Sequence, residues 1–153
     1  MTRLAPRGKA FSDVLVEIFC IKTLTLHAAE ALAAEVGLTS THWQILGFLE
    51  REPVPVAHVA RAIGLTRQSV QQAADAMEGE GLIAYEENPY HKRARLMTLT
   101  PKAHKALDYL RPHQIEWANQ MGSGHTLEAL RTTLDVLHDS RTRLERALRK
   151  DAQ

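Results

Sequence analysis

The sequence is poor in the features that mark secreted, membrane-spanning and disulfide-stabilised proteins. One cysteine, Cys20, occurs in 153 residues, so no disulfide can form within the chain and a reducing compartment is indicated. No run approaches the roughly 18 consecutive apolar residues of a membrane span, and the opening MTRLAPRGKAFSDV lacks the apolar core of a secretory signal. Aromatic residues make up only 5%, and much of the apolar content is alanine, leucine and valine, which favours a helix-rich fold.

Motifs of enzymes and metal centres are also missing. We find no nucleophile motif, phosphate-binding loop or paired-carboxylate site, so nothing positive indicates an enzyme. The eight histidines are scattered, with no pair four residues apart and one cysteine to join them. We therefore expect neither a metal nor a cofactor.

Acidic residues are absent from one stretch of a chain whose net charge is only +1. Residues 88–107 contain no Asp or Glu but two His and five cationic residues: Lys92, Arg93, Arg95, Lys102 and Lys105. Such a run is usually a solvated face. At the tip of a hairpin beside an exposed polar helix, however, it is typical of a nucleic-acid contact.

The pattern of residues 56–79 predicts two short helices joined by a tight turn. The first helix, 56–63, ends at Gly64, where a left-handed residue is often needed. Thr66 is the expected N-cap of the second helix, which two glycines stop. The front of this helix is polar, with Thr66, Arg67, Gln68, Ser69, Gln71 and Gln72. An exposed helix start of this composition can reach base edges in the major groove.

A β-hairpin is predicted next, with strands at 82–85 and 95–99 around a charged tip. The tip and its return strand carry His91, Lys92, Arg93 and Arg95. A basic hairpin tip of this kind can reach phosphates or an adjacent minor groove. Helix, turn, helix and β-wing therefore form one DNA-reading unit.

Longer helix patterns flank this unit. We expect a flexible basic arm at residues 1–9, a long helix at 11–35, a helix at 40–51 capped by Thr39, and a short strand at 54–56. After the wing, Thr100 caps a helix that runs from Pro101 to about Met121, and Thr126 caps the last helix.

The last helix has a heptad seam, with leucines at 127, 130, 134, 137, 144 and 148 and Arg141 at the one interrupted position. The alternative is packing on the chain's own first helix, but so small a domain offers a terminal helix little to bury against. Intermolecular helix pairing is therefore favoured. The predicted fold is mainly α with a small β-wing (α+β), in a single domain of residues 1–153. It has dimerisation helices at 11–35 and 101–149 and a winged helix-turn-helix lobe at 39–100, with the wing at about 84–99.

Four segments together resemble one known family. They are GLTSTHWQIL at 37–46, ARAIGLTRQSV at 60–70, GLI at 81–83 and KRARLMTLTPK at 92–102. In this order and spacing, over about residues 11–149, the chain closely resembles the MarR family (multiple antibiotic resistance regulators) of bacterial transcription regulators. The resemblance implies a cytoplasmic, nucleoid-associated homodimer whose first and last helices interlock at the apex of a triangle. It also implies binding to a pseudo-palindromic DNA operator, repression of neighbouring genes, and release by a small, commonly aromatic ligand.

The resemblance also assigns roles to residues. The front of the second short helix would be the recognition helix, and Arg93 would enter the minor groove. The family usually has an Asp two residues before this arginine, where this chain has His91, so the customary ion pair that braces the wing is missing. Arg67 and Gln71, one turn apart, are the expected base readers. Lys92, Arg95 and Lys102 would add sequence-independent, salt-sensitive attraction.

The family's effector pocket lies where the first two helices meet. The corresponding residues are Phe19, Cys20, Leu24, His27, His42, Trp43 and Leu46. Ordinary packing is the alternative reading of each, although His42 beside Trp43 could recognise a phenol or a carboxylate. Cys20 could be a thiol redox sensor, but the thiol-sensing branch places its cysteine where this chain has Leu15, so an inert buried cysteine is the alternative. A winged helix that binds proteins rather than DNA is the competing class, which the basic wing disfavours.

Overall fold

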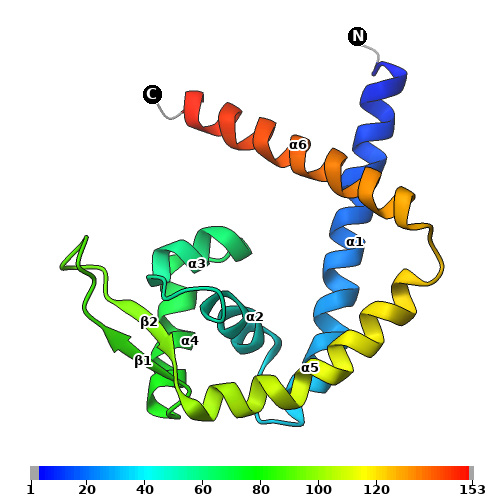
Figure 1. The fold of residues 1–153 in the computed structure, drawn as a ribbon. Coiled ribbons are helices and arrows are strands. Elements are labelled where there is room, and N and C mark those ends of the chain that lie inside the picture. The colour runs from blue at the N-terminus through cyan, green and yellow to red at the C-terminus, as the bar shows by residue number, and fades with distance from the viewer. Residues whose placement is uncertain (1–3, 152–153) are drawn as a thin grey trace. The chain divides into compact units, whose positions relative to one another are not determined.

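The structure is a computed structural model that describes residues 4–151. It contains two compact units, Met1–Arg111 and Pro112–Gln153, which are treated separately below. The predicted fold class is confirmed, since helices dominate and one small sheet is present (Figure 1). The elements are α1 Pro6–Ala34, α2 Ser40–Leu49, α3 Val56–Ile63, α4 Arg67–Gly79, β1 Ile83–Glu86, β2 Leu96–Leu99, α5 Pro101–Gly122 and α6 Leu127–Asp151.

The core of the first unit lies among α2, α3, α4 and the sheet. On α4 the buried side chains are Val70, Ala74 and Met77, whose spacing of four and three residues places them on one helix face. Ile45 and Leu46 of α2 meet this face in the same cluster of buried side chains. With this stripe of α4 in the core, the opposite face is left to solvent.

Helix starts and stops follow local chemistry. Thr39 and Thr66 cap α2 and α4, because their hydroxyl oxygens accept the backbone N–H of His42 and Ser69, each at 3.1 Å. α3 ends at Gly64, whose φ of 71° is left-handed, as the tight turn was predicted to require. The bounds of α3 and the start of α4 therefore agree with the sequence pattern.

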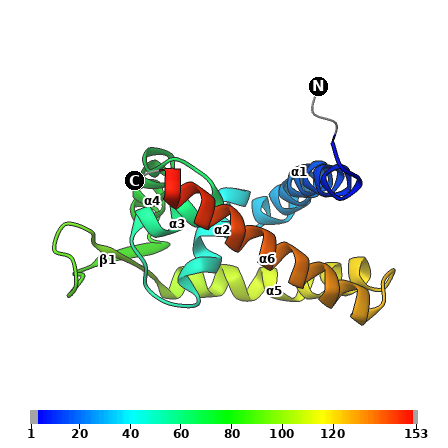
Figure 2. The ribbon, with the colours of Figure 1, turned by 90° about the horizontal axis from the view of Figure 1, so that it is seen from above.

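The wing is an antiparallel pair in which Ile83 faces Leu99 and Glu86 faces Leu96. Seen from above, the hairpin projects beyond α3 and α4 (Figure 2). The strand expected at 54–56 is reduced to one bridge, in which the Met97 N–H donates to the Val54 carbonyl at 3.0 Å. Val56 already belongs to α3.

The N-terminal arm is the main correction to the predicted elements. Residues 6–9 are helical, because Pro6 occupies the first turn, where its missing N–H costs nothing, and Lys9 pairs with Asp13 at 2.8 Å. Met1–Arg3 lie outside the described residues. Along α1 most apolar side chains are exposed, with Phe19 at 67% and Leu24 at 69%.

The second unit consists of the rest of α5 from Pro112 onward and α6. Thr126 caps α6 as predicted, accepting the Ala129 N–H at 3.1 Å. Exposed leucines line α6, at 127, 130, 134, 144 and 148, and Leu137 is half-buried. Among the described residues, no helix is both long enough and apolar enough to cross a membrane. The expectation of a single domain stays a prediction.

Candidate nucleic-acid interface

The front of α4 presents the predicted recognition residues in two ways. Arg67, Gln68 and Gln72 are exposed. Thr66 and Ser69 are engaged with each other, since the Thr66 hydroxyl donates to Ser69 Oγ at 3.0 Å and accepts the Ser69 N–H. This pair fixes the first turn, so Arg67 and Gln68 leave α4 from a rigid helix start.

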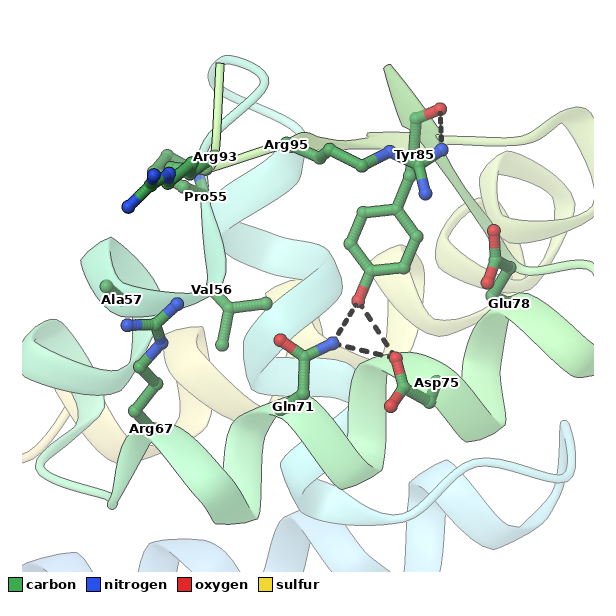
Figure 3. A pocket seen from close by; sticks show the side chains of 11 residues that line it. Pro55, Val56, Ala57, Arg67, Gln71, Asp75, Glu78, Tyr85, Arg93 and Arg95 are labelled. Carbon is green, nitrogen blue, oxygen red and sulfur yellow. Dashed lines mark hydrogen bonds between the residues drawn. The ribbon is translucent and has the colours of Figure 1, made fainter. Parts of the chain in front are cut away.

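Gln71 differs from its neighbours because it is half-buried and bonded across to the wing. Its amide nitrogen donates to Asp75 Oδ1 at 2.7 Å and to the Tyr85 hydroxyl at 2.9 Å. The Tyr85 hydroxyl in turn donates to Asp75 Oδ1 at 3.3 Å, which closes a three-membered network between α4 and β1 (Figure 3). Tyr85 and Asp75 were not among the predicted site residues. The four-residue step from Gln71 to Asp75 was a signal for half of this network.

Arg95 secures the other side of Tyr85. Its guanidinium donates to the Tyr85 carbonyl oxygen at 3.0 Å and lies over the Tyr85 ring, 4.9 Å from the ring centre. Burial, followed by the negative charge of Asp75, raises the pKa of the Tyr85 hydroxyl above its ordinary value. The hydroxyl therefore stays protonated at neutral pH and keeps its hydrogen bond to Asp75.

The wing tip is braced without the missing ion pair. Asn88 spans the loop, where its amide nitrogen donates to the Ala94 carbonyl at 2.9 Å and its amide oxygen accepts the Tyr90 N–H at 3.0 Å. The side chain of His91 is exposed. Asn88 was outside the predicted site, although Asn followed by Pro is a turn signal.

A groove of about 240 Å³ separates α4 from the wing. It is lined by Pro55, Val56, Ala57, Arg67, Gln71, Asp75, Glu78, Tyr85, Arg93, Ala94 and Arg95. Arg67 from α4 and Arg93 from the wing loop lie toward one end, and Asp75 and Glu78 toward the other (Figure 3). Arg67, an expected base reader, and Arg93, the arginine expected to enter the minor groove, therefore lie at one cationic mouth of the groove.

The remaining cations of the basic run fall into two groups. Lys92 and Arg93 are exposed, and neither has a hydrogen bond or an ion pair with a described residue. Lys102 instead donates from Nζ to the Glu80 carbonyl at 2.7 Å, at the C-terminal end of α4. Lys102 therefore binds the C-terminal end of α4, whereas the predicted recognition residues lie at the N-terminal end of this helix.

The residues expected to form an effector pocket are dispersed. Leu46 is a fully buried core residue, and Trp43 packs against the core. Phe19, Leu24 and His27 are exposed on α1, as is Cys20, so the expectation that Cys20 is buried is wrong for the isolated chain. None of the seven lines the groove described above. The pocket stays a prediction.

His42 is the exception within that set, because its Nδ1 is buried with no hydrogen-bond partner. Nearby, the Ser40 N–H donates to Glu30 at 2.7 Å, which ties α1 to the start of α2. Hydrogen bonding to the Ser40 side chain and then to the Ser40 backbone N–H, with smaller contributions from the charges of His42 and His27, holds the pKa of Glu30 below its ordinary value. No group of three His, Cys, Asp or Glu side chains within the described part of the chain is placed to hold a metal ion.

Comparisons with known proteins converge on one family. The family model described as MarR family matches residues 36–94, which hold α2, α3, α4 and most of the wing. An uncharacterized protein of Mycobacterium tuberculosis is 29% identical over 124 residues, covering 81% of this chain and 87% of that protein. The transcriptional activatory protein BadR of Rhodopseudomonas palustris is 33% identical over 85 residues, covering 53% of this chain and 48% of BadR.

Solved structures share the fold at low sequence identity. The MarR family transcriptional regulator AbsC from Streptomyces coelicolor has a TM-score of 0.76 at 17% identity, covering 95% of this chain and 99% of AbsC. Sco3205 of the same organism, solved in complex with DNA, has a TM-score of 0.73 at 16% identity, with 92% and 89% covered. CouR from Rhodococcus jostii, bound to p-coumaroyl-CoA, has a TM-score of 0.72 at 18% identity, with 82% and 89% covered.

The family match and the fold agree with the geometry of the site. The matched residues include the helix-turn-helix, β1 and the wing loop, and most of the residues that line the groove. Residues 36–94 match the MarR family model, and the chain has the winged helix-turn-helix fold of solved MarR family transcription regulators.

Proposed function

We propose that this protein is a homodimeric, sequence-specific DNA-binding repressor of neighbouring genes that a small ligand releases from its operator. The observation that carries the proposal is the groove between α4 and the wing, whose cationic mouth is formed by Arg67 and Arg93. A cationic groove beside an exposed polar helix start fits the edge of a DNA duplex. Acting on chromosomal DNA, the protein would work on the bacterial nucleoid in the cytoplasm.

The two arginines would divide the work. Arg67 projects from the first turn of α4, where a bidentate contact with guanine is worth about 1–3 kcal/mol of discrimination. Arg93 lies on the wing loop and would contact the minor groove and phosphates, which carry less sequence information. Gln68 and Gln72 are exposed beside Arg67 and complete the contact surface, with Lys92 on the wing.

Dimerisation would use the exposed apolar faces of α1 and α6. Phe19 and Leu24 on α1, and Leu134 and Leu148 on α6, are each at least 61% exposed in the isolated chain. Apolar side chains in such numbers favour burial in a partner. A two-fold dimer would read two half-sites about 10 bp apart, so the operator should be pseudo-palindromic.

Release by a ligand is the remaining part of the proposal. The unpartnered Nδ1 of His42 would gain a hydrogen bond from a ligand bound near α1 and α2. CouR, which shares the fold, was solved with p-coumaroyl-CoA. An aromatic acid or its thioester is therefore the class to screen first. Oxidation of the exposed Cys20 is the alternative trigger.

The test is binding of purified protein to labelled DNA from upstream of its own gene, at two salt concentrations, with a scrambled competitor. Specific, salt-sensitive binding by a dimer supports the proposal. Arg93→Ala should weaken binding on all sequences, whereas Arg67→Ala should also relax sequence choice. Equal losses on every sequence for both variants would overturn this division of labour, and no binding at low salt would favour a protein-interaction module.

The direction of regulation and the trigger need separate readouts. Deleting the gene should raise transcription of its neighbours, whereas a fall would indicate an activator, as BadR is named. Aromatic ligands should release the DNA from wild type but less so from a His42→Phe variant. Release by peroxide in wild type but not in Cys20→Ser would instead make the thiol the trigger.

A further inference from the structure

Hydrogen bonds within the chain engage the nitrogen of the Gln71 side-chain amide. Both hydrogens of its nitrogen have acceptors within the chain, one in Asp75 and the other in Tyr85. Its oxygen points away from Tyr85, toward the mouth of the groove where Arg67 lies (Figure 3). Gln71 thus presents an acceptor to the groove and keeps its donor inside the protein.

Chemistry fixes this orientation. An amide can in principle be turned so that nitrogen and oxygen exchange places. The Asp75 carboxylate, however, can only accept hydrogen bonds, and an amide oxygen set 2.7 Å from it would be repelled. The nitrogen must therefore face Asp75 while the network stands.

Tyr85 makes the orientation rigid. Its hydroxyl accepts from Gln71 and donates to Asp75, so each proton in the network has one acceptor. The Tyr85 ring is held from the other side by Arg95, which bonds the Tyr85 carbonyl and lies over the ring. Burial raises the pKa of the Tyr85 hydroxyl, so the hydroxyl keeps the proton that it donates to Asp75.

We propose that Tyr85 and Asp75 are specificity-determining residues that turn Gln71 into a pure acceptor, so that it reads bases carrying an exocyclic amine in the major groove. A free glutamine pairs with adenine through two hydrogen bonds, accepting from N6 and donating to N7. Gln71 held by Asp75 and Tyr85 can make only the first of these bonds. Adenine N6 and cytosine N4 both offer that donor, whereas guanine O6 and thymine O4 are acceptors that would repel the amide oxygen.

The inference rests on the proposed function, because it assumes that α4 enters the major groove. Its measurable content is separate, however. The inference specifies which bases are tolerated at one operator position. It also specifies that two residues that do not face the base, Tyr85 on the wing and Asp75 on α4, decide which bases these are. A net hydrogen bond of about 0.5–1.5 kcal/mol corresponds to roughly 2- to 12-fold discrimination.

The experiment selects DNA from a library randomised around the half-site, using full-length wild type and the variants Gln71→Ala, Tyr85→Phe and Asp75→Ala. The operator position that Gln71 reads is the position at which the Gln71→Ala variant loses the base preference of wild type. There, wild type should take adenine and cytosine about equally and prefer both over guanine and thymine by roughly 2- to 12-fold. Freeing the amide in Asp75→Ala should favour adenine over cytosine and admit guanine or thymine. Tyr85→Phe should move the profile in the same direction.

Tyr109→Phe is the matched control. The Tyr109 hydroxyl also donates to a carboxylate, that of Glu35, at 2.9 Å, within the same unit but on α5. The base preferences of Tyr109→Phe should equal those of wild type. The comparison therefore separates a general effect of losing a phenol–carboxylate hydrogen bond from an effect on Gln71. If Asp75→Ala fails to fold, Tyr85→Phe and Gln71→Ala still decide the question.

The outcomes distinguish the inference from the proposed function. A wild-type protein that selects no sequence at all overturns both. If wild type selects an operator but prefers adenine alone at the Gln71 position, the amide is bidentate and the inference is overturned while the function stands. Unchanged profiles in Tyr85→Phe and Asp75→Ala, or in Gln71→Ala, overturn the inference in the same way.

Discussion

Replacing Lys92 on the wing should change how DNA binding responds to salt, whereas replacing Lys102 on α5 should change this response much less. Lys92 is exposed on the wing loop and bonded to no described residue, so it is available to a phosphate. Lys102 donates to the Glu80 carbonyl at 2.7 Å. Thirteen residue steps separate Arg67 from Glu80 along α4, about 20 Å at the rise of an α-helix. That distance exceeds twice the Debye length of about 8 Å at physiological salt.

The magnitude follows from counterion release. Each phosphate contact contributes about 0.9 to the slope of log K against log salt, so a dimer that loses Lys92 from both wings should lose about 1.8. Between 50 and 200 mM salt, wild type should therefore lose roughly 12-fold more affinity than Lys92→Ala loses. Lys102→Ala should change the slope by well under half of that amount.

Fluorescence anisotropy with an operator fragment, at five or more salt concentrations, measures the slopes. Lys9→Ala serves as the control for lost charge, because Lys9 lies on α1 and pairs with Asp13 at 2.8 Å. The reasoning is refuted if Lys102→Ala lowers the slope as much as Lys92→Ala does, or if Lys92→Ala leaves it unchanged.

Three further predictions concern stability and assembly. Gly64→Ala should lower the free energy of unfolding by about 1–2 kcal/mol, because the φ of 71° is left-handed, whereas Gly47→Ala within α2 should raise it by about 0.5–1 kcal/mol. Urea denaturation measures both, and equal signs would contradict the backbone argument. Glu30→Gln should lower Tm most at neutral pH. The lowered pKa of Glu30 means that its contribution is present above the ordinary glutamate range and is lost as pH falls through the lowered pKa. A Tm difference that persists in acid would show that charge is not the cause. Leu134→Lys, on the exposed face of α6, should shift the protein toward monomer in light scattering and weaken operator binding; an unchanged dimer would place the interface elsewhere.

Much of the helix-turn-helix was readable from the sequence because its signals are local. A threonine that caps a helix acts within three residues, and a glycine that takes a left-handed conformation acts at its own position. The bounds of α3, the start of α4 and the caps at Thr100 and Thr126 follow from such signals. Where the signals were weak, at the basic N-terminus, the expected arm was wrong from residue 6 onward, because α1 begins at Pro6.

The roles of individual polar side chains needed the tertiary structure. Gln71 and Lys102 look like any exposed polar residues in the sequence, yet one is bonded to Tyr85, fourteen residues away, and the other to Glu80, twenty-two residues away. His91 replaces the expected aspartate, but only the folded loop shows that Asn88 braces the wing instead. Periodicity and caps determine which residues are helical and which face is buried, because those preferences act over one or two turns. Which donor meets which acceptor depends on how the chain returns upon itself, and therefore only the packed lobe decided what Gln71 can offer to a base.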